Sequence, residues 1–360
     1  MSGLTGTTAT RPWVDVVINN FNYGRFLDDA IDSALAQTYE HVRVIVVDDG
    51  STDSSREVIA SYGDRIEPVL KDNGGQASCF NAGLQRSRGD IVIFLDADDL
   101  LVPEAVDRVV DAFAASPETA RVHYRLAVVD ERGVPTGEIK PARHIPLPSG
   151  NLREATLRFP FDLARPATSG NAYSARVLKE LAPIKDCGDR VGADWYVVCL
   201  SPLLGQVGAI DEPLGMYRLH GRNVHERSST VLDLDQIRAT IRYTACTRLY
   251  LQELAVRLRL PWDRRDASMS EVADRAISLK LDRAGHPIPG DTLPRLVRLG
   301  VRATTRRFDV RAPLKGAFLA WLICLAVAPR PLARPLAEMF VYPSRRMRIN
   351  AWLRRMSRRR

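Results

Sequence analysis

Short apolar runs alternate with helical patterns over the first 130 residues. The runs are rich in β-branched residues, as is typical of strands in a parallel sheet that is covered on both faces. They lie at residues 14–19, 42–48, 66–70 and 91–95, the third being the weakest. Apolar residues recur every three to four positions in the segments that follow, at 26–36, 54–62, 76–86 and 103–115. This alternation predicts an α/β fold with a mostly parallel, Rossmann-like sheet and helices on both faces.

Polar clusters follow three of the predicted strands. NNFNYG follows the first strand, DDGSTD the second and DADD the fourth. In open parallel sheets, ligands bind beyond the carboxyl ends of the strands. We therefore expect these clusters to line the functional site.

The second half of the chain is organised differently. Proline and glycine are frequent in residues 132–148, which predicts a loop or an irregular hairpin. Two long helical patterns follow, at 231–258 and 268–284. The expected organisation is a disordered N-terminus, an α/β domain, a helical region and a basic, apolar tail, with bounds at 1–12, 13–226, 227–294 and 295–360.

The tail holds the excess positive charge of the chain. It has 17 Lys and Arg against two acids, Asp309 and Glu338, whereas the remaining residues have an acidic excess of about 7. Its longest apolar run, residues 317–328, is shorter than the roughly 20 residues that cross a bilayer. We therefore expect the tail to anchor the protein peripherally at the inner face of the membrane. The alternatives are a helical subdomain with a solvated basic face and, least favoured, a nucleic-acid surface.

The expected location is therefore cytoplasmic, with the tail on the membrane and no nucleic-acid partner. The N-terminal residues MSGLTGTTATRPW lack the basic and apolar segments of a secretory signal. On this hypothesis, deletion of residues 312–360 releases the protein from the membrane and leaves hydrolysis of the donor intact.

The DADD motif places three carboxylates within four positions. In an extended strand end, Asp96 and Asp98 share a face about 7 Å apart, and Asp99 points elsewhere. Two carboxylates at an exposed mouth suit Mg²⁺ or Mn²⁺, which often bind one or two protein carboxylates together with substrate phosphates. The alternative is a solvated acidic turn in which Asp99 only caps the following helix.

Two long stretches resemble the inverting family 2 glycosyltransferases of the GT-A fold. They are residues 14–59, with DDGSTD, and residues 73–106, with NGGQASCFNAG and DADD in the same order and spacing. The resemblance is close over residues 13–116 and thins to about residue 225. It implies that the protein transfers a sugar from a nucleotide donor.

The resemblance also implies roles for residues on the donor side. Asn19, Phe21 and Asn22 would pack against the nucleotide base. Asp49 would accept a hydrogen bond from the imide of uracil, which favours UDP- or dTDP-sugars. Asn81 is the best polar candidate in the glycine-rich stretch.

The reacting groups follow from the same resemblance. Asp96 would contact the ribose or the sugar, and Asp98 the metal. Asp194 would be the general base for the acceptor hydroxyl, with Asp189 in reserve, although this chain has Ala193 where relatives have glutamate. The alternative is that Asp194 only caps a helix.

Two further segments match more loosely. Residues 168–174, TSGNAYS, resemble a small-residue turn between the donor and acceptor sites. Residues 216–225 resemble a flexible closing loop in which Arg218 and His220 would offset the charge of the leaving diphosphate.

The expected function is an inverting, metal-dependent transfer of a sugar to a glycan or lipid-linked acceptor in cell-envelope or polysaccharide synthesis. One alternative is a sugar nucleotidyltransferase, but the first polar cluster has only Arg25 nearby to hold a triphosphate. The other is a non-catalytic module that binds nucleotide sugars. The glycine-rich stretch fits neither GxxxxGK[ST] nor GxGxxG, which argues against ATP and NAD.

Overall fold

The computed structural model describes residues 11–185, 187, 192–221, 223 and 232–342. They form two compact units. The α/β unit comprises the described parts of Met1–Arg153 and Ala164–His220, and the helical unit those of Glu154–Leu163 and Gly221–Arg360. The segment expected to be disordered, 1–12, lies almost wholly outside the described residues.

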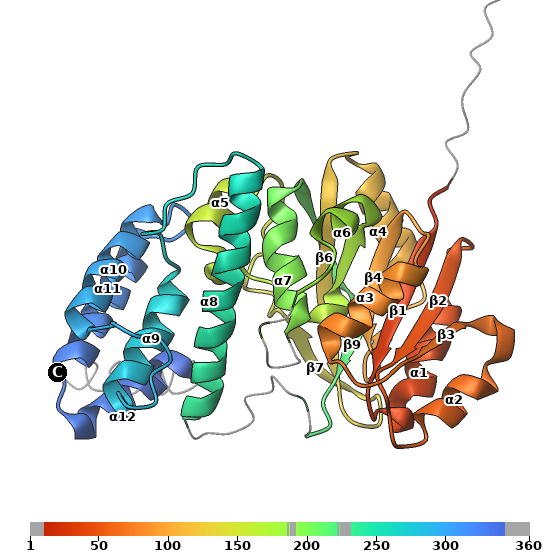
Figure 1. The fold of residues 1–360 in the computed structure, drawn as a ribbon, viewed down its shortest axis with the longest axis horizontal. Coiled ribbons are helices and arrows are strands. Elements are labelled where there is room, and N and C mark those ends of the chain that lie inside the picture. Colours follow the sequence, from red (N-terminus) through yellow and green to blue (C-terminus); the bar gives the residue numbers. More distant parts are fainter. Residues whose placement is uncertain (1–10, 186, 188–191, 222, 224–231, 343–360) are drawn as a thin grey trace, which may run out of the picture. The chain divides into compact units, whose positions relative to one another are not determined.

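One mixed sheet forms the centre of the α/β unit (Figure 1). Its strands are β1 (Val14–Asn20), β2 (Val42–Asp48), β3 (Glu67–Leu70), β4 (Ile91–Asp96), β5 (Leu100–Leu101), β6 (Thr119–Val129), β7 (Pro135–Lys140), β8 (Asn171–Ser174) and β9 (Gln206–Arg218). They are ordered β3-β2-β1-β4-β8-β6-β9-β5, and β7 pairs with β6. The four predicted strands are adjacent and parallel, which confirms the parallel half of the sheet. β8 is antiparallel to β4 and β6, and β6 and β7 form the hairpin predicted near residue 132.

Helices cover both faces of this sheet, as the sequence predicts. They are α1 (Gly24–Leu35), α2 (Ser55–Ser61), α3 (Gln76–Arg86), α4 (Ala105–Ala114), α6 (Ala175–Leu181) and α7 (Ala193–Leu200). Val16 and Ile18 of β1 pack with α1, α2 and α4 in one core, whereas Val17 faces α3. A Cβ atom on Gly83 of α3 would lie 2.3 Å from Val17 Cγ1. The glycine-rich stretch therefore brings α3 against the sheet, as expected.

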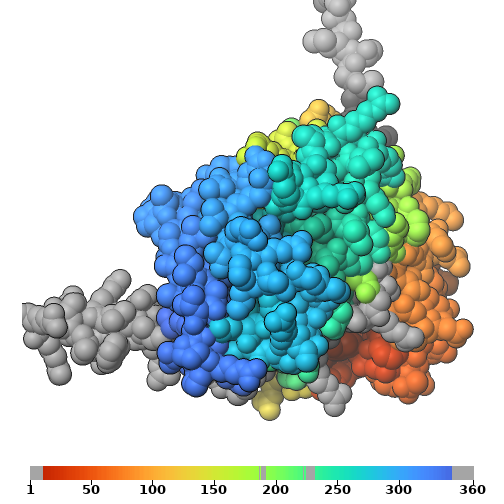
Figure 2. Space-filling view, turned by 60° about the vertical axis from the view of Figure 1, so that its left-hand side comes forward, coloured from red at the N-terminus to blue at the C-terminus, as the bar shows by residue number. Residues whose placement is uncertain are grey.

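The helical unit has a core of its own. Its helices are α5 (Arg153–Arg158, from Glu154 onward), α8 (Leu234–Arg257), α9 (Met269–Leu281), α10 (Leu293–Arg306), α11 (Ala312–Val327) and α12 (Arg330–Val341). Ile241 of α8, Ile277 of α9, Leu296 of α10 and Leu322 of α11 are buried together. In the space-filling view, the described residues from α8 onward, teal to blue, form one continuous body (Figure 2).

The described part of the predicted tail belongs to this core. Phe318, Leu322 and Leu325 of α11 are buried, so the inward face of the tail follows the helical-packing alternative. Deletion of residues 312–360 would remove these side chains from the core. We therefore expect this deletion to destabilise the helical unit as well; its effect on membrane attachment and on hydrolysis of the donor stays a prediction.

The outward face of α11 is apolar as well. Leu314, Ile323 and Val327 are 62%, 48% and 76% exposed. Within the described ranges, no helix combines the length and the apolar character needed to cross a bilayer. Peripheral anchoring of the tail remains a prediction.

Candidate active site

The DADD motif leaves β4 at the carboxyl edge of the sheet. Asp96 is the last residue of β4, and the Asp99 amide donates to the Asp96 carbonyl at 3.0 Å to close the turn. Asp99 is 1% exposed, whereas the side chain of Asp98 is 14% exposed. The turn therefore presents Asp98 more openly than Asp99.

Each of the three carboxylates has a hydrogen-bond partner in the chain. Asn19 Nδ2 of β1 donates to Asp96 Oδ1 at 2.8 Å. His220 Nε2 lies 2.8 Å from Asp98 Oδ2, and Ser169 Oγ donates to Asp99 Oδ2 at 2.6 Å. The pairing of Asn19 with Asp96 follows from the register of β1 and β4, which places these two residues side by side.

Negative charge nevertheless remains in excess at this edge. Burial, followed by the charge of Asp98, raises the pKa of Asp96 to about 7, and Asp194 adds to the effect. Hydrogen bonds from Asn19 and from Thr168 oppose this rise in the Asp96 pKa. Burial, followed by the charges of Asp98 and Asp96, raises the pKa of Asp99 well above its ordinary value. A cation at this edge would lower the electrostatic cost of keeping these groups ionised.

The donor set fits a hard divalent cation that also binds the substrate. Among the described residues, no group of three or more His, Cys, Asp or Glu side chains is arranged to hold a metal ion. Asp96 and Asp98 alone would leave most of the coordination sphere to substrate oxygens and water. This is the usual mode of Mg²⁺ at phosphate-binding sites.

Asp194 lies in the first turn of α7 and acts electrostatically on Asp96. The predicted base therefore lies close enough to the DADD motif to interact electrostatically with Asp96. Gln76 of α3 holds this turn, because its Oε1 accepts hydrogen bonds from the amides of Gly192 at 2.9 Å and Ala193 at 3.0 Å. The reserve candidate, Asp189, lies outside the described residues.

Asp49 anchors the glycine-rich stretch. It is 2% exposed, and its carboxylate accepts hydrogen bonds from the amides of Gly74 at 2.9 Å and Gly75 at 2.7 Å, as well as an ion pair from Lys71. The sequence did not predict these contacts. They place Asp49 next to the residue, Gln76, that holds the α7 turn.

The first polar cluster forms a junction with DDGSTD. Asn22 adopts a left-handed backbone conformation, with φ of 59°. Its side-chain oxygen accepts a hydrogen bond from the amide of Thr52 at 2.8 Å, and its own amide donates to Ser51 Oγ at 2.9 Å. Phe21 beside it is 45% exposed, so its ring offers a flat apolar face to solvent.

Asn81 is placed differently from the expectation. Its side-chain amide donates to the carbonyl of Ile184 and accepts from the amide of the same residue, both at 2.8 Å. The two polar groups of Asn81 therefore join α3 to the chain after α6. We assign Asn81 a structural contact, because a direct contact with the donor would have to break this pair.

Arg218 and His220 both contact the DADD turn. Arg218 does so from the end of a strand, and His220 from the chain that follows it. Arg218 is the last residue of β9 and is 2% exposed, which corrects its expected place in a flexible loop. It donates to Asp99 through its amide and to Asp29 of α1 through its guanidinium, at 3.0 and 2.7 Å. The ring of His220 packs against Phe26 at 5.1 Å between centroids. Residues 222 and 225 of the same segment lie outside the described residues.

The sequence signals for the supporting residues differ. Ser169, which bonds Asp99, lies in the TSGNAYS stretch noted above. Gln76 and Asp29 had no such signal, because each acts through a partner more than 100 residues away along the chain.

Comparisons with known proteins identify the family and agree with the fold. The pattern of glycosyl transferase family 2 matches residues 15–181. An uncharacterized glycosyltransferase from Nostoc sp. is 33% identical over 249 residues, covering 68% of this chain and 76% of the relative. A second uncharacterized glycosyltransferase, from Rickettsia felis, is 34% identical over 144 residues, which are 39% of this chain but only 24% of that protein. Among solved structures, S. aureus TarS 1–349 in complex with UDP has a TM-score of 0.50 at 13% identity, covering 91% of both chains.

Proposed function

The chain belongs to glycosyltransferase family 2, and from this premise we propose that it transfers a sugar with inversion from a uridine or thymidine diphosphate donor to a hydroxyl group. The acceptor in this proposal is a glycan or a lipid-linked glycan of cell-envelope or polysaccharide synthesis. Membership of the family sets aside the nucleotidyltransferase alternative.

The arrangement of Asp96, Asp98 and Asp194 carries the proposal. Two carboxylates at the carboxyl edge of a parallel sheet suit a nucleotide diphosphate with its cation. A third carboxylate, on a separate helix, lies close enough to raise the pKa of Asp96. An inverting transfer requires this division of labour, because the base and the leaving group act on opposite sides of the anomeric carbon.

Asp98, with Asp96 beside it, would hold Mg²⁺ or Mn²⁺, which when bound supplies Lewis-acid neutralisation of the diphosphate. The residues of this chain then perform the remaining work. Asp194 takes the proton of the acceptor hydroxyl as the oxygen bonds to the anomeric carbon. The bond between that carbon and the diphosphate oxygen breaks, and the nucleoside diphosphate leaves with the bonding electron pair. His220 lies 2.8 Å from Asp98, and this contact supports the proposal that its ring offsets the charge of the leaving group.

Recognition of the base is proposed for Asn19, Phe21, Asn22 and Asp49. The exposed ring of Phe21 supports stacking on a nucleobase. Asp49 Oδ1 already accepts from Lys71 and from the amide of Gly74, whereas Oδ2 accepts from one loop amide, that of Gly75. Because each carboxylate oxygen has two lone pairs, Oδ2 is the atom proposed to accept from an imide. This preference for an N–H donor favours uracil or thymine over cytosine.

Nucleotide-sugar binding can be measured by thermal shift, with Mn²⁺ and with Mg²⁺. We expect a uridine or thymidine compound to stabilise the wild-type chain and to lose this effect in Asp98→Ala. Asp194→Asn should still bind the donor but turn over about 10²- to 10⁴-fold more slowly. Asp111→Asn, an exposed acid on α4, is the matched control.

Two outcomes would refute parts of this assignment. If Asp98→Ala binds and turns over like the wild type, the cation site lies elsewhere. If Asp194→Asn retains full turnover, the base is another group. A chain that binds donor but never releases nucleoside diphosphate, with any acceptor or with water, would be a non-catalytic module.

A further inference from the structure

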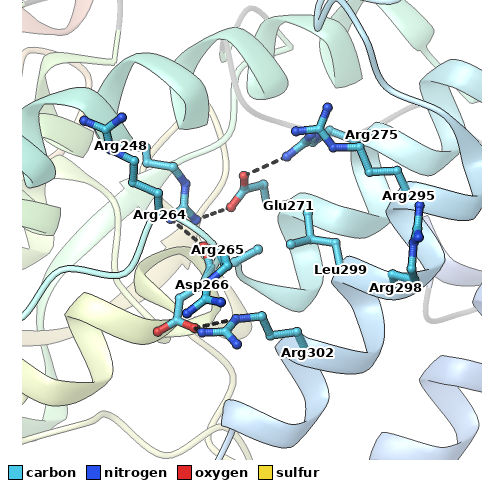
Figure 3. A pocket seen from close by; sticks show the side chains of 11 residues that line it. Arg248, Arg264, Arg265, Asp266, Glu271, Arg275, Arg295, Arg298, Leu299 and Arg302 are labelled. Carbon is cyan, nitrogen blue, oxygen red and sulfur yellow. Dashed lines mark hydrogen bonds and ion pairs between the residues drawn. The ribbon is translucent and has the colours of Figure 1, made fainter.

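A cavity of about 460 Å³ lies within the helical unit, between α8, the loop after it, α9 and α10 (Figure 3). Of its eleven lining residues, seven are arginines and two, Asp266 and Glu271, are acidic. Ala267 and Leu299 contribute apolar surface. The functional assignment above uses none of these residues.

The acids of this cavity are already bound to arginines. Glu271, which is 6% exposed, forms ion pairs with Arg248 of α8 and Arg275 of α9. Asp266 pairs with Arg302 of α10 at 2.9 Å. These pairs, drawn as dashed lines in Figure 3, hold three guanidinium groups in fixed positions around the cavity.

Positive charge remains after these pairs are counted. Within the part of the chain that the structure describes, Arg264 and Arg298 line the cavity and form no ion pair. Arg295 bonds only a backbone carbonyl, that of Gly290 at 3.3 Å. Figure 3 shows Arg295 and Arg298 one turn apart on α10, both at the cavity. Outside the lining, Asp263 neutralises Arg265 by an ion pair at 3.0 Å.

A buried donor atom also lacks a partner at this place. Arg248 Nε is inaccessible to solvent and makes no hydrogen bond to any described residue. Burying a donor without an acceptor costs about 1–3 kcal/mol. This atom lies out of reach of a ligand in the cavity, so the donors available to an anion are the exposed guanidinium groups of Arg264, Arg295 and Arg298.

The N-terminus of α9 does not contribute free amide groups to the positive charge of the cavity. The amides of Met269 and Ser270, in its first turn, donate to the carboxylate of Asp162 at 2.7 and 2.9 Å. The helix N-terminus is therefore already occupied, and the guanidinium groups alone supply the attraction for an anion.

From this geometry we propose that the arginine cavity is a binding site for a phosphate ester. The planar fork of arginine matches the oxygens of phosphate in pairs, which favours Arg clusters at phosphate sites. A volume of about 460 Å³ is typical of pockets for whole small molecules. The ligand is therefore a phosphate group attached to something larger, either a soluble phosphate ester or the headgroup of a phospholipid.

Removal of Arg264 and Arg298 tests the site without breaking an ion pair. We would titrate the full chain with glycerol 3-phosphate by calorimetry, in EDTA and without any nucleotide sugar, so that failure of the transfer mechanism does not affect the result. Loss of two charge-assisted contacts should weaken binding at least about tenfold in Arg264→Ala/Arg298→Ala. Arg283→Ala/Arg311→Ala removes the same charge from two exposed positions of the helical unit and should change binding less than about twofold.

A second arm distinguishes the two sources of phosphate. Sedimentation with vesicles of phosphatidylglycerol and phosphatidylcholine is compared between the same two double variants, which share the tail, so that its contribution cancels. Selective loss in Arg264→Ala/Arg298→Ala with vesicles alone assigns the site to a headgroup, and loss with glycerol 3-phosphate assigns it to a soluble ester. Equal binding by the two double variants, or no binding of either probe by the wild type, overturns the proposal. Matching melting temperatures without ligand verify that the variants are folded.

Discussion

Replacement of Gln76 by methionine should slow turnover with little effect on donor binding. Gln76 Oε1 accepts two hydrogen bonds from the turn that begins α7, the helix that carries Asp194. Methionine has nearly the same length but no strong acceptor. The variant therefore keeps the packing of α3 and loses only the link to the α7 turn.

The size of the effect follows from these two bonds. Each hydrogen bond contributes about 0.5–1.5 kcal/mol net, so together they favour the observed position of the turn by roughly 1–3 kcal/mol. This range corresponds to a factor of about 5 to 150 in a local equilibrium. Because a misplaced base loses rate steeply, we expect release of nucleoside diphosphate to fall by about 10- to 100-fold in Gln76→Met.

Two comparisons separate positioning from general stability. Gln76→Glu keeps an acceptor oxygen and should recover most of the lost rate. Gln37 also joins backbone groups, accepting from the amide of Val106 at 3.0 Å and donating to the carbonyl of Val102 at 2.9 Å. Gln37→Met should lower the melting temperature comparably and leave the rate per folded molecule unchanged. If Gln76→Met turns over within twofold of the wild type, the α7 turn does not depend on this link.

Three further predictions concern stability. Burial and nearby Arg121 lower the pKa of His123 from 6.5 to about 3, so acid stabilises the unfolded chain, which takes up the proton first. Between pH 7.5 and 4.5, protonation of His123 in the unfolded chain should lower the free energy of unfolding by about 3 kcal/mol. Urea unfolding of His123→Phe should lack this part of the pH dependence. Gly83→Ala places a methyl group against β1 and should lower the free energy of unfolding, measured by urea titration, by about 1–3 kcal/mol; an unchanged value would show that α3 shifts to accept the methyl group. Deletion of residues 312–360 should lower the melting temperature of the helical unit, because it removes Phe318, Leu322 and Leu325 from the core; an unchanged melting temperature would show that α11 does not belong to the core.

The parallel half of the sheet could be predicted because its signals are local. Runs of β-branched residues ended by polar clusters defined β1, β2 and β4 within one residue, and the predicted helix 76–86 was observed with the same bounds. The second half of the sheet was harder, because β8 and β9 owe their places to pairing with β4 and β6 across long sequence separations. Packing of α11 into the helical core could not be predicted, because the apolar pattern of a helix does not identify the helices that it contacts.

The candidate site shows the same division. Asp194 lies close enough to the DADD motif to affect Asp96 electrostatically, and the roles that the resemblance implies for these acids stay predictions. Asn81 was a reasonable candidate by its position, but its amide is bound to the backbone of Ile184. Arg218 was expected in a loop and is held in β9 by contacts to Asp99 and Asp29. Residue type and motif position identify the side chains that could take part in the reaction. The side chains that position them can be identified only from their contacts in the structure.

These contacts also explain how three neighbouring acids tolerate one another before any ligand binds. Asn19, His220 and Ser169 each bond a different carboxylate, so each acid has its own compensation from the chain. The compensation is partial, since the pKa of Asp96 is still raised to about 7. A fully neutralised cluster would have little affinity for a cation, and an uncompensated one would destabilise the fold. The partial balance leaves net negative charge that would attract a cation, and a bound cation would in turn attract the diphosphate of a donor.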